Sequence, residues 1–142
     1  MSVERILAGK GRHVETIFPS HSLQEAAQIL AAKRIGAVVV VSPEKAVLGI
    51  LSERDIVRAI ALDPSRLSRP VSEFMTEKVI TCGLKTSVPE VMDQMTSGRF
   101  RHLPVVVEGA LQGLVSIGDV VKFRVAEFEA ESNALRQYIA SA

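Results

Sequence analysis

Two short segments of the sequence combine a hydroxyl and a carboxylate at a spacing that suits ligand binding. Residues 49–55 read GILSERD and residues 113–119 read GLVSIGD, each an apolar strand end followed by the start of a helix. A Ser at the helix N-cap with an acidic residue three positions later is a capping box, which is the purely structural interpretation. The same two groups, beside free backbone N–H groups, could instead hold a ribose diol with its phosphate near the positive end of the helix dipole. Because the pair occurs twice, 64 residues apart, we favour the ligand-binding interpretation.

Other residues that could do chemistry form no catalytic or metal-binding pattern. The segment GLVSIG is similar to a nucleophile elbow, but Leu114 stands where that motif needs a glycine. Asp55 and Asp119 lie at equivalent ends of two repeats and would serve separate sites rather than one acid–base pair. The three histidines and Cys82 show no metal-ligand spacing. We therefore predict that the protein is not an enzyme and holds no metal.

The composition argues against several classes of partner. Of the 142 residues, 47% are apolar, which suffices for a packed core, and the formal charge of +1 disfavours binding to nucleic-acid phosphates. Trp is absent, so stacking on single-stranded nucleic acid is also disfavoured. No apolar run approaches the ~20 residues of a membrane helix, the first residues do not resemble a signal peptide, and the lone Cys82 fits a reducing compartment. We expect a cytoplasmic protein that binds neither nucleic acid nor membranes.

The elements that must position the two Ser/Asp pairs are predicted in the same order twice. After a short helix ended by Gly9 and Gly11, we expect an extended segment at 13–18, a helix at 22–33, strands at 37–41 and 47–51, a helix at 52–62 and a linker at 63–70. Strands at 79–81, 103–107 and 111–115 then repeat the first set, at an offset of 65 that becomes 64 after a shorter hairpin turn. The strand at 37–41 is apolar on both faces and should be central in its sheet. A fixed period with one deletion in a turn indicates an internal duplication.

The duplicated unit resembles a tandem pair of cystathionine-β-synthase (CBS) domains, often called a Bateman module. The resemblance is carried by Gly49, Ser52 and Asp55 and by their counterparts Gly113, Ser116 and Asp119. The segments PVSEFMTEKVIT at 70–81 and RFRHLPVV at 99–106 resemble the opening and the central strand of a second CBS repeat. The implied fold is α/β (α+β), with β-α-β-β-α repeats at 9–66 and 71–128 packed sheet to sheet with pseudo-two-fold symmetry. Residues 129–142 would extend the last helix.

The resemblance implies ligand sensing without catalysis. CBS pairs typically bind AMP, ADP, ATP, S-adenosylmethionine or sometimes NAD(H) in clefts between the repeats. Carried over to this sequence, Asp55 and Asp119 would accept hydrogen bonds from ribose hydroxyls, Ser52 and Ser116 would support the ribose or phosphate, and Thr16 and Thr81 would lie along the nucleoside. An adenine needs an apolar slot with backbone partners. Such a slot could come from Ile17, Pro19, Val38 and Val39 in one repeat, and from Ile80, Leu103 and Pro104 in the other.

The two expected sites differ in charge. Arg101 and His102 begin the second central strand, where basic residues of the family often meet phosphate, whereas the first repeat has Gly36 and Ala37 there. Conversely, Arg54 and Arg58 accompany Asp55, whereas Gly118 and Lys122 accompany Asp119. These residues could also be a solvated strand edge and ordinary helix ion pairs worth ~0.3–0.5 kcal/mol. The number of arginines favours a phosphorylated ligand.

The last helix, predicted from about residue 118 to 140, outlasts its repeat. Its apolar residues fall at spacings of four, three, seven and four, with a gap at residues 131–132: Val121, Val125, Phe128, Leu135 and Ile139. This a/d-like stripe could pack on its own domain, but its length favours contact with a second subunit. CBS pairs also commonly form two-fold, disc-like dimers, so the resemblance implies a homodimer.

We therefore predict a non-catalytic regulatory module that binds an adenine nucleotide and relays its presence by a shift at the surface of a dimer or of a possible, unidentified protein partner. Two alternatives remain. The module could bind NAD(H) and sense redox state, or it could be a dimeric adaptor whose Ser/Asp pairs only cap helices. The adaptor hypothesis predicts that Asp119→Asn costs ~1 kcal/mol of stability without affecting ligand binding.

Overall fold

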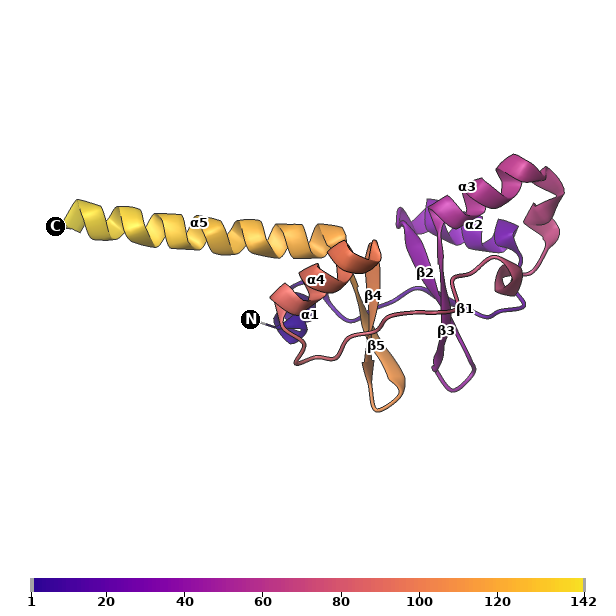
Figure 1. Ribbon diagram of the computed structural model, residues 1–142, viewed down its shortest axis with the longest axis horizontal. Coiled ribbons are helices and arrows are strands. Elements are labelled where there is room, and N and C mark those ends of the chain that lie inside the picture. The colour runs from indigo at the N-terminus through magenta and orange to yellow at the C-terminus, as the bar shows by residue number, and fades with distance from the viewer. Residues whose placement is uncertain (1, 142) are drawn as a thin grey trace.

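The computed structural model describes residues 2–141, which form two α/β units side by side (Figure 1). Residue 142, the last of the predicted helix extension, lies outside the described residues. The first unit contains β1 (Thr16–Ile17), α2 (Leu23–Lys33), β2 (Ala37–Val41), β3 (Val47–Ser52) and α3 (Glu53–Leu62). Two 3-10 turns, Pro64–Ser68 and Val71–Glu73, lead to the second unit of α4 (Val88–Gly98), β4 (His102–Val107), β5 (Ala110–Ser116) and α5 (Ile117–Ser141). A short helix, α1 (Val3–Lys10), precedes both.

The first sheet has the order β1-β2-β3, with β2 central as the sequence predicted. β1 pairs with β2 in parallel, Ile17 opposite Val40, and β3 pairs with β2 antiparallel, Ile50 opposite Val39. All five residues of β2 are buried, which is expected of a strand covered on both faces. The predicted extended segment at 13–18 contributes only two residues of strand.

Within residues 2–141 the second sheet contains two strands, β4 and β5, so the predicted strand at 79–81 was wrong. The chain there makes a single parallel bridge between Cys82 and Val105, which occupy the positions of Ile17 and Val40 in the first repeat. In the first repeat the N–H of Val39 donates to the carbonyl of Glu15. The equivalent of Val39 is Pro104, which has no N–H, so this ladder bond cannot form.

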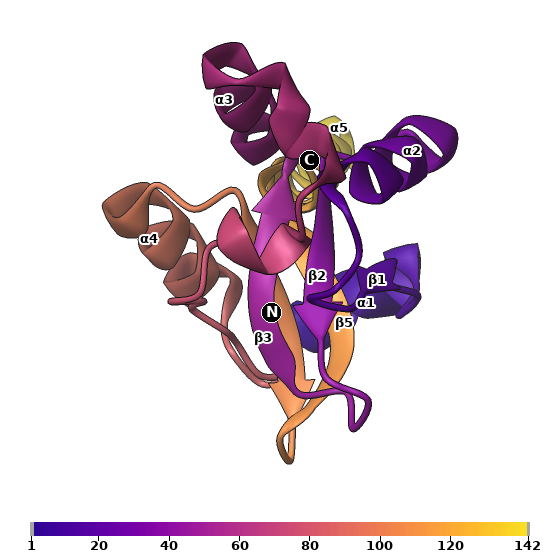
Figure 2. The same cartoon turned by 90° about the vertical axis from the view of Figure 1, so that its right-hand side faces the viewer.

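Side chains on β2 and β4 alternate between a helix-covered face and a face turned toward the other sheet. Val38 and Val40 belong to the core beneath α2 and α3, and Leu103 and Val105 to the core beneath α1 and α4. Val39 and Pro104 are also buried but belong to neither core. They therefore lie between the sheets, in agreement with Figure 2, where β2 and β3 lie in front of β5. This is the sheet-to-sheet packing that the sequence predicted.

Each unit is completed by the segment that precedes the other repeat, which the sequence analysis did not anticipate. Leu7 of α1 is buried in the core of the second unit, and Val71 is buried in the core of the first. Two glycines permit this close approach. A Cβ on Gly113 would lie 2.8 Å from Leu7 Cδ1, and one on Gly49 would lie 2.9 Å from the carbonyl oxygen of Thr76. The sequence repeat and the packed unit therefore do not have the same boundaries.

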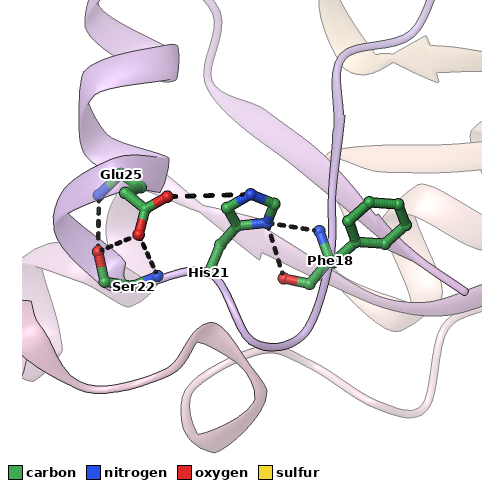
Figure 3. A network of polar contacts seen from close by, with 4 residues as sticks. All are labelled: Phe18, His21, Ser22 and Glu25. Carbon is green, nitrogen blue, oxygen red and sulfur yellow. Dashed lines mark hydrogen bonds and ion pairs between the residues drawn. The ribbon is translucent and has the colours of Figure 1, made fainter.

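The capping pattern at 22–25 fixes the start of α2 (Figure 3). Ser22 Oγ accepts a hydrogen bond from the N–H of Glu25, and the Glu25 carboxylate accepts one from the N–H of Ser22. His21 Nδ1 accepts a hydrogen bond from the N–H of Phe18, and the two rings stack with centroids 5.9 Å apart. In the second unit Ser87 Oγ likewise accepts from the N–H of Glu90. Helix α2 thus begins where the sequence predicted, and α4 begins at the equivalent position of the second repeat.

Candidate functional site

Both Ser/Asp pairs form the predicted turn between a strand and a helix. Ser52 Oγ accepts a hydrogen bond from the N–H of Asp55 at 3.2 Å, and Asp55 Oδ2 accepts from the N–H and the hydroxyl of Ser52 at 2.9 and 3.0 Å. Ser116 and Asp119 repeat this geometry, with backbone-to-side-chain distances of 2.8 and 3.1 Å. The hydrogen bonds that Asp55 accepts within residues 2–141 end on Oδ2, so Oδ1 is available to a ligand.

A cleft of about 510 Å³ lies beside the first pair and is lined by residues of both repeats. Ser52, Arg54 and Asp55 enter it from the start of α3. Arg101 and His102 enter from the start of β4, and Ile80 from the segment before it. The other lining residues are Gly36, Ile50, Glu53, Arg58, Thr76, Lys78, Val79, Arg99 and Phe100.

This arrangement corrects the predicted division of charge between the two sites. Arg101 and His102 were assigned to the second site, but Arg101 lines only the first cleft, with Asp55, and His102 lines both clefts. The reason is geometric, because a cleft between two units takes its walls from both. Five cationic side chains and two carboxylates line it, an excess of three positive charges.

Two of these cations, Lys78 and Arg99, were missed by the sequence analysis. Arg99 caps the C-terminus of α4 in the left-handed conformation, with φ of 57°, and thereby returns the chain to β4. Arg34, 65 residues earlier, caps α2 in the same conformation. The repeat offset could therefore have identified position 99 as a turn, although not the cleft that it lines.

A second cleft of about 510 Å³ is lined by Lys10 and Ser116 but not by Asp119. Lys10, at the end of α1, donates from Nζ to Asp119 Oδ2 at 2.5 Å and to the carbonyl oxygen of Leu114 at 2.8 Å. Burial opposes ionisation of Asp119, but the hydrogen bond from Lys10 and those from Ser116 outweigh it and lower the pKa of the carboxyl. The repeat equivalent of Lys10 is the uncharged Met75, which packs against the core of the first unit and lines neither cleft. The other residues that line the second cleft include His13, Val14, Glu15, Lys33, Ile35, Gly36, Ala37 and His102.

His102 lines both clefts and lies beside Gly36, whose Cβ position is 3.9 Å from the imidazole. Burial lowers the pKa of His102, and the nearby charges of Lys10 and Arg101 lower it further, whereas Asp119 and Glu53 raise it. The pKa therefore lies below its ordinary value of 6.5, and the ring is neutral at pH 7. A neutral imidazole between the clefts can gain a proton when an anion enters.

Several predicted site residues do not line either cleft. Ile17, Val38, Val39, Leu103 and Pro104 are buried in the cores or between the sheets, so these residues of the predicted adenine slots line neither cleft. Apolar strand residues give the same sequence pattern whether their side chains face a core or a ligand. Thr16 lines a separate pocket of about 280 Å³, Thr81 is exposed outside both clefts, and the Pro19 carbonyl oxygen accepts a hydrogen bond from the N–H of Ser72.

Among residues 2–141 there is no cluster of three potential metal ligands. Over the same range, no helix combines the length and the apolar character needed to span a bilayer.

Comparison with known proteins identifies the same duplicated unit. The family model of the CBS domain matches residues 10–62 and again 71–126. The mitochondrial CBS domain-containing protein CBSX3 of Arabidopsis thaliana is 39% identical over 123 residues, which are 83% of this chain and 60% of that protein. The chain thus spans less than two thirds of this curated relative.

Solved structures match over most of the chain. The CBS-domain containing protein ATU1752 from Agrobacterium tumefaciens is 46% identical, with a TM-score of 0.84 over 87% of this chain and 99% of that one. The CBS domain pair of protein MJ0100, solved in complex with 5-methylthioadenosine and S-adenosyl-L-methionine, is 26% identical, with a TM-score of 0.81 over 89% and 98% of the two chains.

Proposed function

The chain belongs to the CBS domain family, and from this premise we propose that it is a non-catalytic regulatory module that binds an adenosine phosphate in its first cleft. The proposal rests on one observation. Ser52 and Asp55 line the same cleft, and the charged side chains that line this cleft have a net charge of three positive charges. A ribose needs a fixed carboxylate acceptor, and a phosphate needs cations and backbone N–H groups at a helix start. The volume of about 510 Å³ is within the range of small-molecule sites.

The lining of the cleft suggests how the ligand would lie. The ribose hydroxyls would donate to Asp55 Oδ1, the phosphate would lie between Arg101 and the N-terminus of α3, and the adenine would pack against Val79 and Ile80. The relative MJ0100 binds two adenosine derivatives, which supports an adenosine ligand. The positive charge favours AMP, ADP or ATP over 5-methylthioadenosine, which carries no phosphate.

Thermal melting against a panel of ligands tests this function. We would melt the protein with AMP, ADP, ATP, NAD, NADH and S-adenosylmethionine, using Asp55→Ala and Asp119→Ala as a matched pair, because each variant loses the same capping carboxylate. A ligand at 100 times its dissociation constant adds ~2.7 kcal/mol of stability, a shift of several degrees. We expect AMP, ADP or ATP to raise the melting temperature of Asp119→Ala but not of Asp55→Ala.

The same panel separates the alternatives. The largest shift with NAD or NADH would favour a redox-state sensor. If no ligand shifts the melting temperature, the Ser/Asp pairs only cap helices and the adaptor hypothesis is the better account.

A further inference from the structure

The helix α5 carries an exposed apolar stripe that continues beyond the second unit. Figure 1 shows α5 projecting as an arm away from both sheets. Val121, Val125, Phe128, Leu135 and Ile139 are between 51 and 72% exposed. Together with Ser132 they follow a spacing of four, three, four, three and four residues, which is the a/d repeat of a coiled coil.

The stripe is not the face on which α5 packs against its own unit. Val120 is buried in the second core, and Phe123 packs against that core. Position 121 is rotated by about 100° from position 120 in a helix of 3.6 residues per turn. The contacts within the chain therefore leave the stripe uncovered along its length.

The residue types on the stripe favour a pair of parallel helices. The a positions are Val125, Ser132 and Ile139, and the d positions are Val121, Phe128 and Leu135. β-Branched residues at a and leucine at d favour two parallel strands, a pattern that Val125, Ile139 and Leu135 match, and a polar residue at one a position, here Ser132, can specify the register.

The charges beside the stripe fit the same arrangement. The g positions Arg124 and Glu131 and the e positions Glu129 and Arg136 alternate in sign. In a parallel, in-register pair each g side chain faces the e side chain five residues later in the other helix. Arg124 would then face Glu129 of the partner subunit, and Glu131 would face Arg136 of the partner subunit. An antiparallel pair that keeps all six a and d positions in contact would instead bring Glu131 close to Glu131 of the partner subunit.

We propose that α5 forms a parallel, in-register, two-stranded coiled coil with α5 of a second copy of this chain. The contact is isologous, because the same stripe serves both chains. It places both CBS pairs at one end of the coil, with their clefts outside the contact. This inference is independent of the ligand, and it replaces an unspecified dimer with a defined helix, polarity and register.

Sedimentation equilibrium of the full chain tests the contact through a matched pair of charge substitutions. Leu135→Asp places a carboxylate on the stripe, whereas Ala134→Asp places it one residue away on an exposed position. We expect the wild type and Ala134→Asp to be dimers, and Leu135→Asp to raise the dimer dissociation constant about tenfold or more, because its charge is desolvated at the contact. A monomeric wild type, or a dimer that Leu135→Asp leaves unchanged, would overturn the proposal.

Charge reversal tests the polarity and the register. Glu131→Arg and Arg136→Glu should each weaken the dimer, and the double reversal should restore it. The two residues are five apart and do not face each other on one helix, so a rescue cannot arise within one chain. A double variant as weak as the single ones would overturn the parallel register. Circular dichroism of each variant should retain the wild-type helix content, because all substituted side chains are exposed.

Discussion

Single residues make the two clefts unequal. The Ser/Asp pairs have the same geometry, but Asp119 accepts a hydrogen bond from Lys10, whereas the repeat equivalent of Lys10, which packs against the core of the first unit, is Met75. The ammonium group of Lys10 supplies within the chain the hydrogen-bond donor that a ribose hydroxyl would otherwise offer to Asp119. Asp55 therefore lines the first cleft with its carboxylate available to a ligand, whereas Asp119 is paired with Lys10 and does not line the second cleft.

Replacing Lys10 should open the second cleft. We expect Lys10→Met to raise the number of AMP molecules bound per chain from one to two in calorimetric titrations, because Asp119 then resembles Asp55. The loss of a partly exposed ion pair should cost less than about 1 kcal/mol of stability in urea unfolding. Since the native pKa of Asp119 is lowered, the wild-type pair stabilises the fold above pH 3.8, and this contribution is lost as the pH falls through the native pKa.

Lys33→Met is the control, because Lys33 lines the second cleft without contacting Asp119. A stoichiometry that stays at one in Lys10→Met would show that the lysine does not limit this cleft.

The protonation of His102 should report ligand entry. Burial keeps its pKa below 6.5 in the free protein, and a phosphate beside it would favour the charged ring. We expect the pKa of His102, followed by its ring carbon–proton signals in NMR, to rise when AMP is added. Binding should accordingly tighten as the pH falls from 7 toward 6. The ring signals of His21, outside both clefts, provide the reference within the molecule. A pKa of His102 that AMP leaves unchanged would exclude a phosphate near its ring.

At the scale of elements, some helix starts only cap the helix, whereas others also line a cleft. Ser22 and Ser52 make the same capping hydrogen bond, but only Ser52 lines a cleft. Ser22→Ala and Ser52→Ala should each cost about 1 kcal/mol of stability. Calorimetry should show weaker AMP binding only for Ser52→Ala. Equal affinity in both variants would mean that Ser52 acts only as a cap.

Local sequence signals predicted most of the elements, and they failed where a segment depends on residues distant in the sequence. Capping residues and apolar alternation located α2, β2, β3 and α3, because these depend on neighbouring positions. The strand expected at 79–81 failed because Pro104, 23 to 25 residues away, cannot donate the ladder hydrogen bond. The burial of Leu7 in the second core depends on contacts about 100 residues apart, for which periodicity carries no information.

At the scale of the whole molecule, each unit is completed by the segment that precedes the other repeat. This arrangement explains why the candidate site was only partly predictable from the sequence. The repeat identified Ser52, Asp55, Ser116 and Asp119 because their spacing is local. It could not identify which basic residues meet which pair, since the clefts lie between units. The prediction therefore divided the arginines between two sites, whereas the packing gathers them in one.

The central claim is that one adenosine phosphate contacts residues of both repeats in the first cleft. The most direct measurement is a titration of the ¹⁵N-labelled protein with AMP, followed by two-dimensional amide NMR. We predict that the amides of residues 52–58 and 99–102 shift together and saturate at the same AMP concentration. Shifts confined to residues 10–15 and 116–119, or no shifts at millimolar AMP, would contradict the account.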